Sequence, residues 1–237
     1  IDNTPPLVVC PLPQTLVLSS DCTATIPDYS LLTTTYDACG IGSLTQLAPP
    51  GFTVSGTGDI TALMILTDVN NNTSQCSFTI TKVDQTPPSI ICPATQTLLL
   101  GANCMAALPD YTNLATATDN CGVQGVTQSP VAGTNVANSG NMTVTLTVKD
   151  INGNSTPCSF MVTKVDNTPP TVQCFPQTLT FNGEAQLVLN VDDLVDASDN
   201  CGVASISISP TVITCSQIGQ TISVTAMVTD INGNAST

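Results

Sequence analysis

The sequence predicts an all-β fold: three tandem β-sandwich modules, stapled by disulfides and arranged end to end. Three observations support this prediction. Motifs recur along the chain at a step of 82 residues, which becomes 80 for the later motifs of the third repeat. Short apolar runs are separated by Gly, Asn, Pro or Asp, and the 237 residues include 11 cysteines. Each repeat is too short to bury a generous core, which is a reason for covalent staples.

Every repeat begins with the same acidic, proline-containing motif. Asp2-Asn3-Thr4-Pro5-Pro6 returns as Asp84–Pro88 and Asp166–Pro170, and each copy is followed by an Asp-x-Cys-Gly and then an Asp-x-Asn-x-Asn motif. Such self-similarity is typical of repeat architectures. We expect modules at residues 1–83, 84–165 and 166–237, the third without its last strand.

The pattern inside each repeat is that of β-strands. Met142–Val148 alternates apolar and polar side chains, as a strand with one buried face does, and no stretch keeps a convincing 3.6-residue period. The strands expected in module two are Ser89–Cys92, Thr95–Leu100, Cys104–Leu108, Val123–Gln128, Met142–Lys149 and Cys158–Val165. Six or seven short strands in about 80 residues predict an immunoglobulin-like sandwich.

The junctions between modules are short. Lys82-Val83-Asp84 and Lys164-Val165-Asp166 lead from a final strand directly into paired prolines. Because proline fixes φ and favours an extended path, we expect these junctions to be stiff.

The composition excludes several classes of function. The formal charge of −14 disfavours nucleic acid and anionic membranes, because both require a basic face. The chain has neither His nor Arg, which removes Ser-His-Asp catalysis, His-ligated zinc and arginine phosphate clamps. No apolar run reaches the roughly 18 residues that a membrane span needs. Paired acids could serve a glycosidase, but the aspartates repeat in every module and an active site has no need of three copies. We expect no enzyme and no catalytic residue.

Cysteine usage indicates an oxidising compartment. Four cysteines allow three pairings in each of modules one and two, and we expect each module to close its own disulfides. The expected pairs are Cys10–Cys22, Cys39–Cys76, Cys92–Cys104, Cys121–Cys158 and Cys174–Cys215, with Cys201 bonded to a cysteine beyond residue 237.

Aspartates recur at matching positions of the repeats. This indicates that each is needed at its own place in the fold and does not serve only to keep the chain soluble. In module two, Asp84, Asp119 and Asp150 lie on segments that share one end of a sandwich. Clustered carboxylates repel one another unless a cation intervenes, and hard oxygen ligands suit Ca²⁺. The same motifs also favour hairpin turns without a metal. A turn and a calcium site are compatible interpretations of these residues. The expected calcium ligands are Asp2, Asp37, Asp68, Asn70, Asp84, Asp119, Asp150, Asn152, Asp166, Asp199, Asp230 and Asn232.

The Thr-Pro-Pro start, Asp119-Asn120-Cys121-Gly122 and Asp150–Asn154 together resemble hyalin-repeat (HYR) modules. These are similar to the immunoglobulin-like tandem repeats of large bacterial cell-surface adhesins. The resemblance covers essentially the whole chain and implies a secreted, cell-surface protein with a role in adhesion or filaments. Ala38 and Asn71 depart from the motifs, so the first module matches them least.

The sequence therefore predicts a structural stalk or spacer of an extracellular adhesin or surface filament, rigidified by disulfides and by calcium between modules. The expected partners are neighbouring modules of the same longer chain, or identical chains in a filament, without nucleic acid or membrane insertion. One alternative is a glycan-binding module, although the chain has no Trp and few aromatic residues. Another is a strand-exchange filament, in which the incomplete third module accepts a neighbour's strand.

Overall fold

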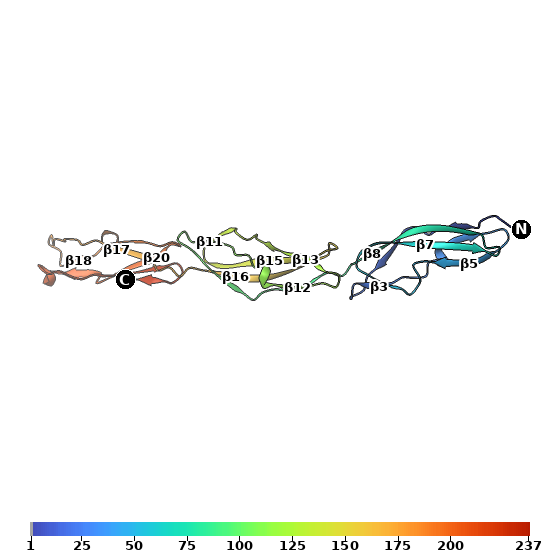
Figure 1. Ribbon diagram of the computed structural model, residues 1–237. Coiled ribbons are helices and arrows are strands. Elements are labelled where there is room, and N and C mark those ends of the chain that lie inside the picture. Colours follow the sequence, from blue (N-terminus) through green and yellow to red (C-terminus); the bar gives the residue numbers. More distant parts are fainter. Residues whose placement is uncertain (1) are drawn as a thin grey trace. The chain divides into compact units, whose positions relative to one another are not determined.

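The computed structural model describes residues 2–237 as a β-rich chain (Figure 1). The chain divides into two compact units. One comprises Ile1–Ile91, Ala115–Thr127 and Leu146–Cys158, and the other Cys92–Leu114, Gln128–Thr145 and Ser159–Thr237. This division runs through the second repeat, so the boundaries predicted for three modules stay a prediction. The terms repeat one, two and three refer here to the sequence repeats.

The main sheet of repeat one has four strands in the order β2-β8-β7-β5 (Figure 1). These strands are β2 (Gln14–Val17), β5 (Ile41–Gln46), β7 (Gly58–Asp68) and β8 (Thr73–Val83). β7 and β8 form a long antiparallel hairpin, and β2 joins β8 in parallel. Ala62, Met64 and Leu66 are buried at alternate positions of β7, so one face of the sheet lines the core.

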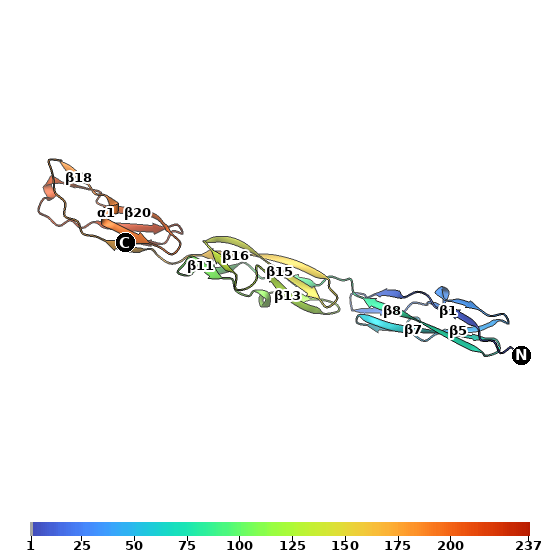
Figure 2. The same ribbon diagram turned by 90° about the horizontal axis from the view of Figure 1, so that it is seen from above.

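Two short ribbons cover that face. β1 (Leu7–Val9) pairs with β4 (Thr34–Tyr36), and β3 (Thr23–Thr25) pairs with β6 (Thr53–Ser55). The 3-10 turn η1 (Ser30–Leu32) precedes β4. Figure 2 shows β1 beside the layer that contains β5 and β7. The core between the layers is formed by Ile26, Tyr29, Ala62, Met64, Phe78 and Ile80.

Repeat two has the same strand order. Its sheet runs β10-β16-β15-β13, and its ribbons are β9–β12 and β11–β14. The elements are β9 (Ser89–Ile91), β10 (Gln96–Leu99), β11 (Met105–Ala107), η2 (Thr112–Leu114), β12 (Thr116–Thr118), β13 (Val123–Ser129), β14 (Asn135–Ala137), β15 (Gly140–Asp150) and β16 (Ser155–Val165). The ring of Tyr111 meets Phe160 edge-on with centroids 5.3 Å apart, as Tyr29 meets Phe78 at 5.2 Å. The predicted immunoglobulin-like sandwich is confirmed.

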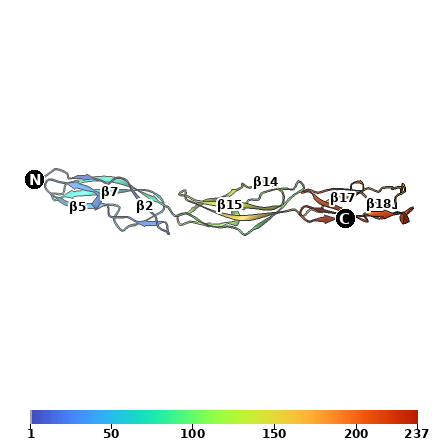
Figure 3. The ribbon, with the colours of Figure 1, turned by 180° about the vertical axis from the view of Figure 1, so that it is seen from behind.

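Repeat three keeps the ribbons β17–β19 and β18–β21 but has a smaller sheet, β20-β22-β23. Its elements are β17 (Thr171–Cys174), β18 (Gln186–Val188), α1 (Val191–Leu194), β19 (Val195–Ser198), β20 (Val203–Ser209), β21 (Val212–Thr214), η3 (Cys215–Gln217), β22 (Thr225–Asp230) and β23 (Ala235–Ser236). β23 pairs only with Val228 and Thr229, and Figure 3 shows the C-terminus part-way along the repeat. An open groove of about 800 Å³, lined by Leu179, Phe181, Ile222 and Val224 among others, lies in this repeat.

The predicted disulfide pairing inside repeat one is wrong. Cys10 bonds to Cys76 across 5.7 Å between the Cα atoms, not to Cys22. Cys10 follows β1, which pairs with β4 rather than with β2, so it packs against the core beside β8. Cys39, which was expected to bond to Cys76, is free and exposed.

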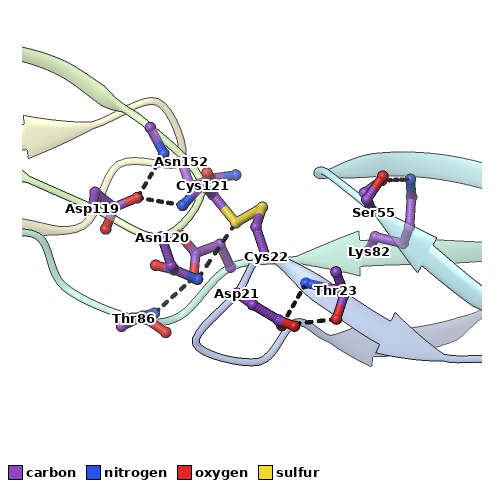
Figure 4. The surroundings of a disulfide bond; sticks show 12 residues. Asp21, Cys22, Thr23, Ser55, Lys82, Thr86, Asp119, Asn120, Cys121 and Asn152 are labelled. Carbon is purple, nitrogen blue, oxygen red and sulfur yellow. Dashed lines mark hydrogen bonds between the residues drawn. A yellow bond between two sulfur atoms is a disulfide. The ribbon is translucent and has the colours of Figure 1, made fainter.

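Two disulfides join consecutive repeats, which the sequence analysis did not anticipate. Cys22 bonds to Cys121 with Cα atoms 5.0 Å apart (Figure 4), and Cys104 bonds to Cys201 with Cα atoms 4.7 Å apart. The predicted pairs Cys92–Cys104 and Cys121–Cys158 are therefore wrong. Cys92 and Cys158, which stand 82 residues after Cys10 and Cys76, are also disulfide-bonded.

The predicted pairs of repeat three are wrong as well. Cys174 and Cys215 are free and exposed, because Cys174 ends β17 in one ribbon and Cys215 follows β21 in the other. Cys201 was expected to bond to a cysteine beyond residue 237, and it bonds instead to Cys104 in the preceding repeat.

Candidate metal sites at the repeat junctions

The hairpin loop between β15 and β16 is organised around Asp150. Its Oδ1 accepts hydrogen bonds from the backbone N–H groups of Asn152 and Asn154, at 2.9 and 2.8 Å, and its Oδ2 accepts one from the Asn154 side chain at 2.7 Å. Burial acts to raise the pKa of Asp150, but these hydrogen bonds outweigh it and hold the pKa below the ordinary value. Asp150 is therefore a fixed, ionised carboxylate.

The Asp-Asn-Cys-Gly loop that follows β12 presents a second carboxylate. Asp119 Oδ1 accepts hydrogen bonds from the N–H groups of Cys121 and Gly122, both at 2.9 Å. Gly122 has a φ of 124°, which only glycine adopts without strain. The loop leaves the other oxygen, Asp119 Oδ2, buried without a hydrogen-bond partner.

Asp84, at the start of repeat two, completes the group. Carboxylate oxygens of Asp84, Asp119 and Asp150 lie within 4.8 Å of one another, as predicted. Asp84 is 5% exposed and Asp150 fully buried. Asp84 Oδ2 and Asn120 Oδ1 also lack hydrogen-bond partners. Three buried acceptors of this region therefore lack partners, and such atoms are costly unless a donor or cation satisfies them.

The same arrangement recurs at the start of repeat three. Asp166, Asp199 and Asp230 bring carboxylate oxygens within 4.8 Å of one another, and Asp166 and Asp230 are 3% and 2% exposed. The buried acceptors without partners there are Asp166 Oδ2, Asp199 Oδ2, Asn200 Oδ1 and Asn232 Oδ1. Among the described residues, every buried side-chain oxygen or nitrogen without a partner belongs to one of these two groups.

Sequence reasoning missed Asn120 and Asn200. The Asn120 amide nitrogen donates hydrogen bonds to the Ser19 carbonyl of repeat one, at 2.9 Å, and to Asp84 Oδ1, at 3.3 Å. Asn200 donates to the Gly101 carbonyl at 3.0 Å and to Asp166 Oδ1 at 3.1 Å. The signal was present, since Asn precedes the cysteine in repeats two and three, whereas repeat one has Ala38.

The first predicted site differs from the other two. Its group comprises Asp2, Asp37 and the Cys39 sulfur, and Asp68 is not part of it. Asp68 is buried and accepts hydrogen bonds from the N–H groups of Asn70 and Asn72, as Asp150 does in its own loop. Asp37 and Asp2 are partly exposed. This end of repeat one therefore offers fewer enclosed oxygens than the two junctions.

The donor set at each junction fits a hard cation. It consists of three carboxylates and a neighbouring amide oxygen, and oxygen ligands of this kind suit Ca²⁺ better than zinc or copper. An inter-repeat disulfide lies next to each group. Cys121 directly follows Asn120 (Figure 4), and Cys201 directly follows Asn200.

Comparison with known proteins finds hyalin-type sequence in part of the chain. Residues 83–164 match the family model of the HYR domain, which supports the predicted hyalin-type repeats. Over 155 residues the chain is 39% identical to hyalin of Strongylocentrotus purpuratus, a match that covers 60% of this chain and 12% of hyalin. The chain thus spans about an eighth of that relative's length. The expected tie to bacterial adhesins is not supported.

Similar solved structures include fragments of titin and of human CDH23. A titin I-band fragment, I67–I69, has a TM-score of 0.38 at 9% identity and covers 99% of this chain and 96% of the fragment. Human CDH23 EC21-23 has a TM-score of 0.36 at 14% identity and covers 98% of both chains. TM-scores at this level support no inference about function.

The disulfides and the HYR match identify the protein as extracellular, as predicted. Residues 2–237 contain no helix long and apolar enough to cross a membrane.

Proposed function

We propose that this chain is a structural segment of an extracellular adhesion or matrix protein, in which calcium and a disulfide together lock each repeat to the next. The observation that carries the proposal is the coincidence, at each of two junctions, of an inter-repeat disulfide and a buried carboxylate group with unsatisfied oxygens.

Electrostatics supports a bound cation. Three carboxylates within 4.8 Å of one another repel strongly in a partly desolvated site. The chain has only three lysines and no arginine, and the side-chain nitrogens of Lys82 and Lys164 donate to carbonyls of Ser55 and Ala137 instead. A divalent ion is the counter-charge that matches the geometry.

The two links would restrain a junction in different ways. The disulfide fixes Cys22, in the turn before β3 of repeat one, to Cys121, in the Asp-Asn-Cys-Gly loop of repeat two. The ion would hold Asp84, which directly follows the last strand of repeat one, β8, against the Asp119 loop and the Asp150 hairpin of repeat two. The similarity to hyalin supports an extracellular matrix or adhesion setting, and the repetition of the same group supports a mechanical rather than an enzymatic role.

The test is thermal unfolding of the full chain in millimolar Ca²⁺ and after chelation, because extracellular sites often have dissociation constants of about 10⁻⁴–10⁻³ M. We expect Ca²⁺ to raise the midpoint, and Asp119→Asn and Asp199→Asn each to remove part of that rise. Asp59→Asn, which changes an aspartate outside the groups, is the matched control. An equal midpoint with and without Ca²⁺ would exclude calcium from the function.

A further inference from the structure

The chain contains several copies of the triplet that accepts N-linked sugars, Asn-x-Ser or Asn-x-Thr. Their asparagines are Asn71, Asn72, Asn141, Asn154 and Asn234. The triplet alone is a weak signal in a chain rich in Asn and Thr. The sugar is attached to the side-chain nitrogen, so that nitrogen must face solvent in the folded protein. The structure separates the asparagines by this criterion.

Three of these asparagines, Asn72, Asn154 and Asn234, use their side-chain nitrogens inside the hairpin loops. Each nitrogen donates a hydrogen bond of 2.7 Å to the buried aspartate of its own loop. Each also donates to the carbonyl of the first aspartate of its repeat, at 3.2, 3.2 and 3.1 Å. A glycan would remove one of these two donors and press a sugar against a buried carboxylate, so the folded loops have no room for one.

Asn141, the second residue of β15, is exposed and differs from these three. Thr163 of β16 donates a hydrogen bond to Asn141 Oδ1 at 3.0 Å. Within residues 2–237 the side-chain nitrogen of Asn141 has no hydrogen-bond partner. The sheet therefore holds the amide by its oxygen and leaves its nitrogen available.

The strand directs the whole triplet away from the core. Val144, Leu146 and Val148 are fully buried at alternate positions of β15. Because successive side chains of a strand point to opposite faces, Asn141 and Thr143 both lie on the outward face of the sheet. Both are exposed.

The register of the hairpin places a methionine beside Asn141 on that face. In repeat one, Asp59 of β7 pairs with Thr81 of β8. The hydrogen bond between Asn141 and Thr163 shows the same pairing in repeat two. Met161 is therefore the diagonal neighbour of Asn141, and such neighbours are about 7–8 Å apart. Its side chain is 45% exposed.

We propose that Asn141 is an N-glycosylation site, and that the first sugars of its glycan lie over the outward face of β15 and β16 and cover Met161. A sugar ring has hydroxyl groups that suit the threonines of this face and C–H groups that suit the exposed thioether. The glycan would shield an apolar side chain that solvent otherwise reaches. This proposal goes beyond the calcium-dependent junctions and does not depend on them.

The reaction is a group transfer from an oligosaccharide that a lipid carries through a pyrophosphate. A bond forms between the Asn141 side-chain nitrogen and C1 of the first sugar, and the bond from C1 to the pyrophosphate oxygen breaks. The lipid pyrophosphate leaves, and the amide gives one proton to a base of the transferase. Nothing is oxidised or reduced. This transfer takes place in the secretory pathway, where disulfides also form.

The experiment expresses the full chain with a secretion signal in a eukaryotic cell line. The background variant is Asn71→Gly, because Asn71 is also exposed and its counterparts in the next two repeats are Gly153 and Gly233. We expect the secreted chain to migrate more slowly on gels, and to lose that shift after treatment with peptide N-glycosidase. Peptide mass spectrometry should place the glycan on Asn141.

Two substitutions remove the triplet through different exposed residues. Asn141→Gln and Thr143→Val should each abolish the mobility shift and leave thermal unfolding unchanged, because neither side chain is in the core. Thr156→Val, which removes the triplet of Asn154, is the matched control and should keep the shift.

Oxidation of Met161 tests where the sugars lie. Dilute peroxide converts an accessible methionine to its sulfoxide, and we expect Met161 to react several-fold more slowly in the glycosylated chain than after enzymatic removal of the glycan. Met105 of β11, 42% exposed outside this sheet, is the control and should react at one rate in both. A secreted chain with unmodified Asn141, or with a glycan on Asn154 in its place, would overturn the site. Equal oxidation of Met161 in both forms would overturn the placement of the sugars.

Discussion

A single amide at each junction, Asn120 or Asn200, contacts three features at once. Its nitrogen reaches the preceding repeat's carbonyl and the first carboxylate, its oxygen lies unpartnered beside the group, and the next residue is the bonded cysteine. The aspartates were predictable because they recur in every repeat. The asparagines gave a weaker signal, since they recur in repeats two and three only. Asparagine before Cys-Gly is also common in turns, and nothing in the local sequence shows contact with another repeat.

The Asn154 side chain is expected to stabilise the second repeat. Its amide nitrogen donates hydrogen bonds to Asp150 Oδ2, at 2.7 Å, and to the Asp84 carbonyl, at 3.2 Å. The substitution Asn154→Ala therefore leaves a buried carboxylate oxygen unsatisfied. We expect a loss of about 1–3 kcal/mol in the free energy of unfolding, measured by urea titration in a chelator. The exposed Asn113→Ala is the control, and a loss no larger than the control's would contradict this role.

The same loops predict an acid dependence. Asp68, Asp150 and Asp230 have pKa values below the ordinary one, because loop hydrogen bonds outweigh the raising effect of burial. Their stabilisation is fully present above the unfolded value of about 3.9 and is lost as the pH falls through the lower folded values. In a chelator, the wild type should lose more stability than Asn154→Ala between about pH 5 and pH 2. Parallel losses would refute this.

At the scale of elements, the long strands were predictable and the short ribbons were not. β15 and β16 alternate over 11 residues, whereas β12 and β14 have three residues each, too few to show a period. The disulfide errors follow from this. Without β12 and β14 to place the cysteines, every cysteine of repeats one and two was assigned a partner inside its own repeat.

The junction disulfide Cys22–Cys121 should stabilise the chain appreciably. It connects residues 99 positions apart, but Cys10–Cys76 already shortens the effective loop. We expect the double variant Cys22→Ser with Cys121→Ser to lose about 2–4 kcal/mol and to bind Ca²⁺ more weakly, by denaturant titration and calorimetry. Cys215→Ser, which removes a free thiol, is the control. Unchanged calcium affinity would separate the two junction links.

The groove of repeat three should accept a strand. In repeat one, Met64 of β7 pairs with Cys76 of β8, which bonds to Cys10. The matching positions of repeat three are Ala226 and the free Cys174. A peptide with the later part of the β16 sequence, residues 158–165, would continue from the position where β23 ends. It is therefore expected to raise the unfolding midpoint and form a disulfide with Cys174 in oxidising buffer. The peptide with Cys158→Ser should bind without the covalent bond. A disulfide formed instead with Cys39 or Cys215 would rule out this register.

For the whole molecule, the two carboxylate groups fall in different compact units, each with its own junction disulfide. In repeat arrays, stability is close to a sum over repeats and nearest-neighbour interfaces. The groups share no residue, so the effects of Asp119→Asn and Asp199→Asn on the calcium-dependent stability should add.

The number of ions per chain tests how far the repeats are equivalent. Repeat one has the aspartates, but Ala38 replaces the asparagine, Asp68 is outside the group, and Asp2 and Asp37 are partly exposed. We expect calorimetric titration of the full chain to give two calcium ions rather than three, because only the two junctions bury oxygens that lack partners. Asp119→Asn should reduce the number to one, and Asp37→Asn should leave it at two. Three sites of equal affinity would contradict this expectation. They would mean that the repeated spacing of the aspartates is enough to form a calcium site, without buried oxygens or contacts from the preceding repeat.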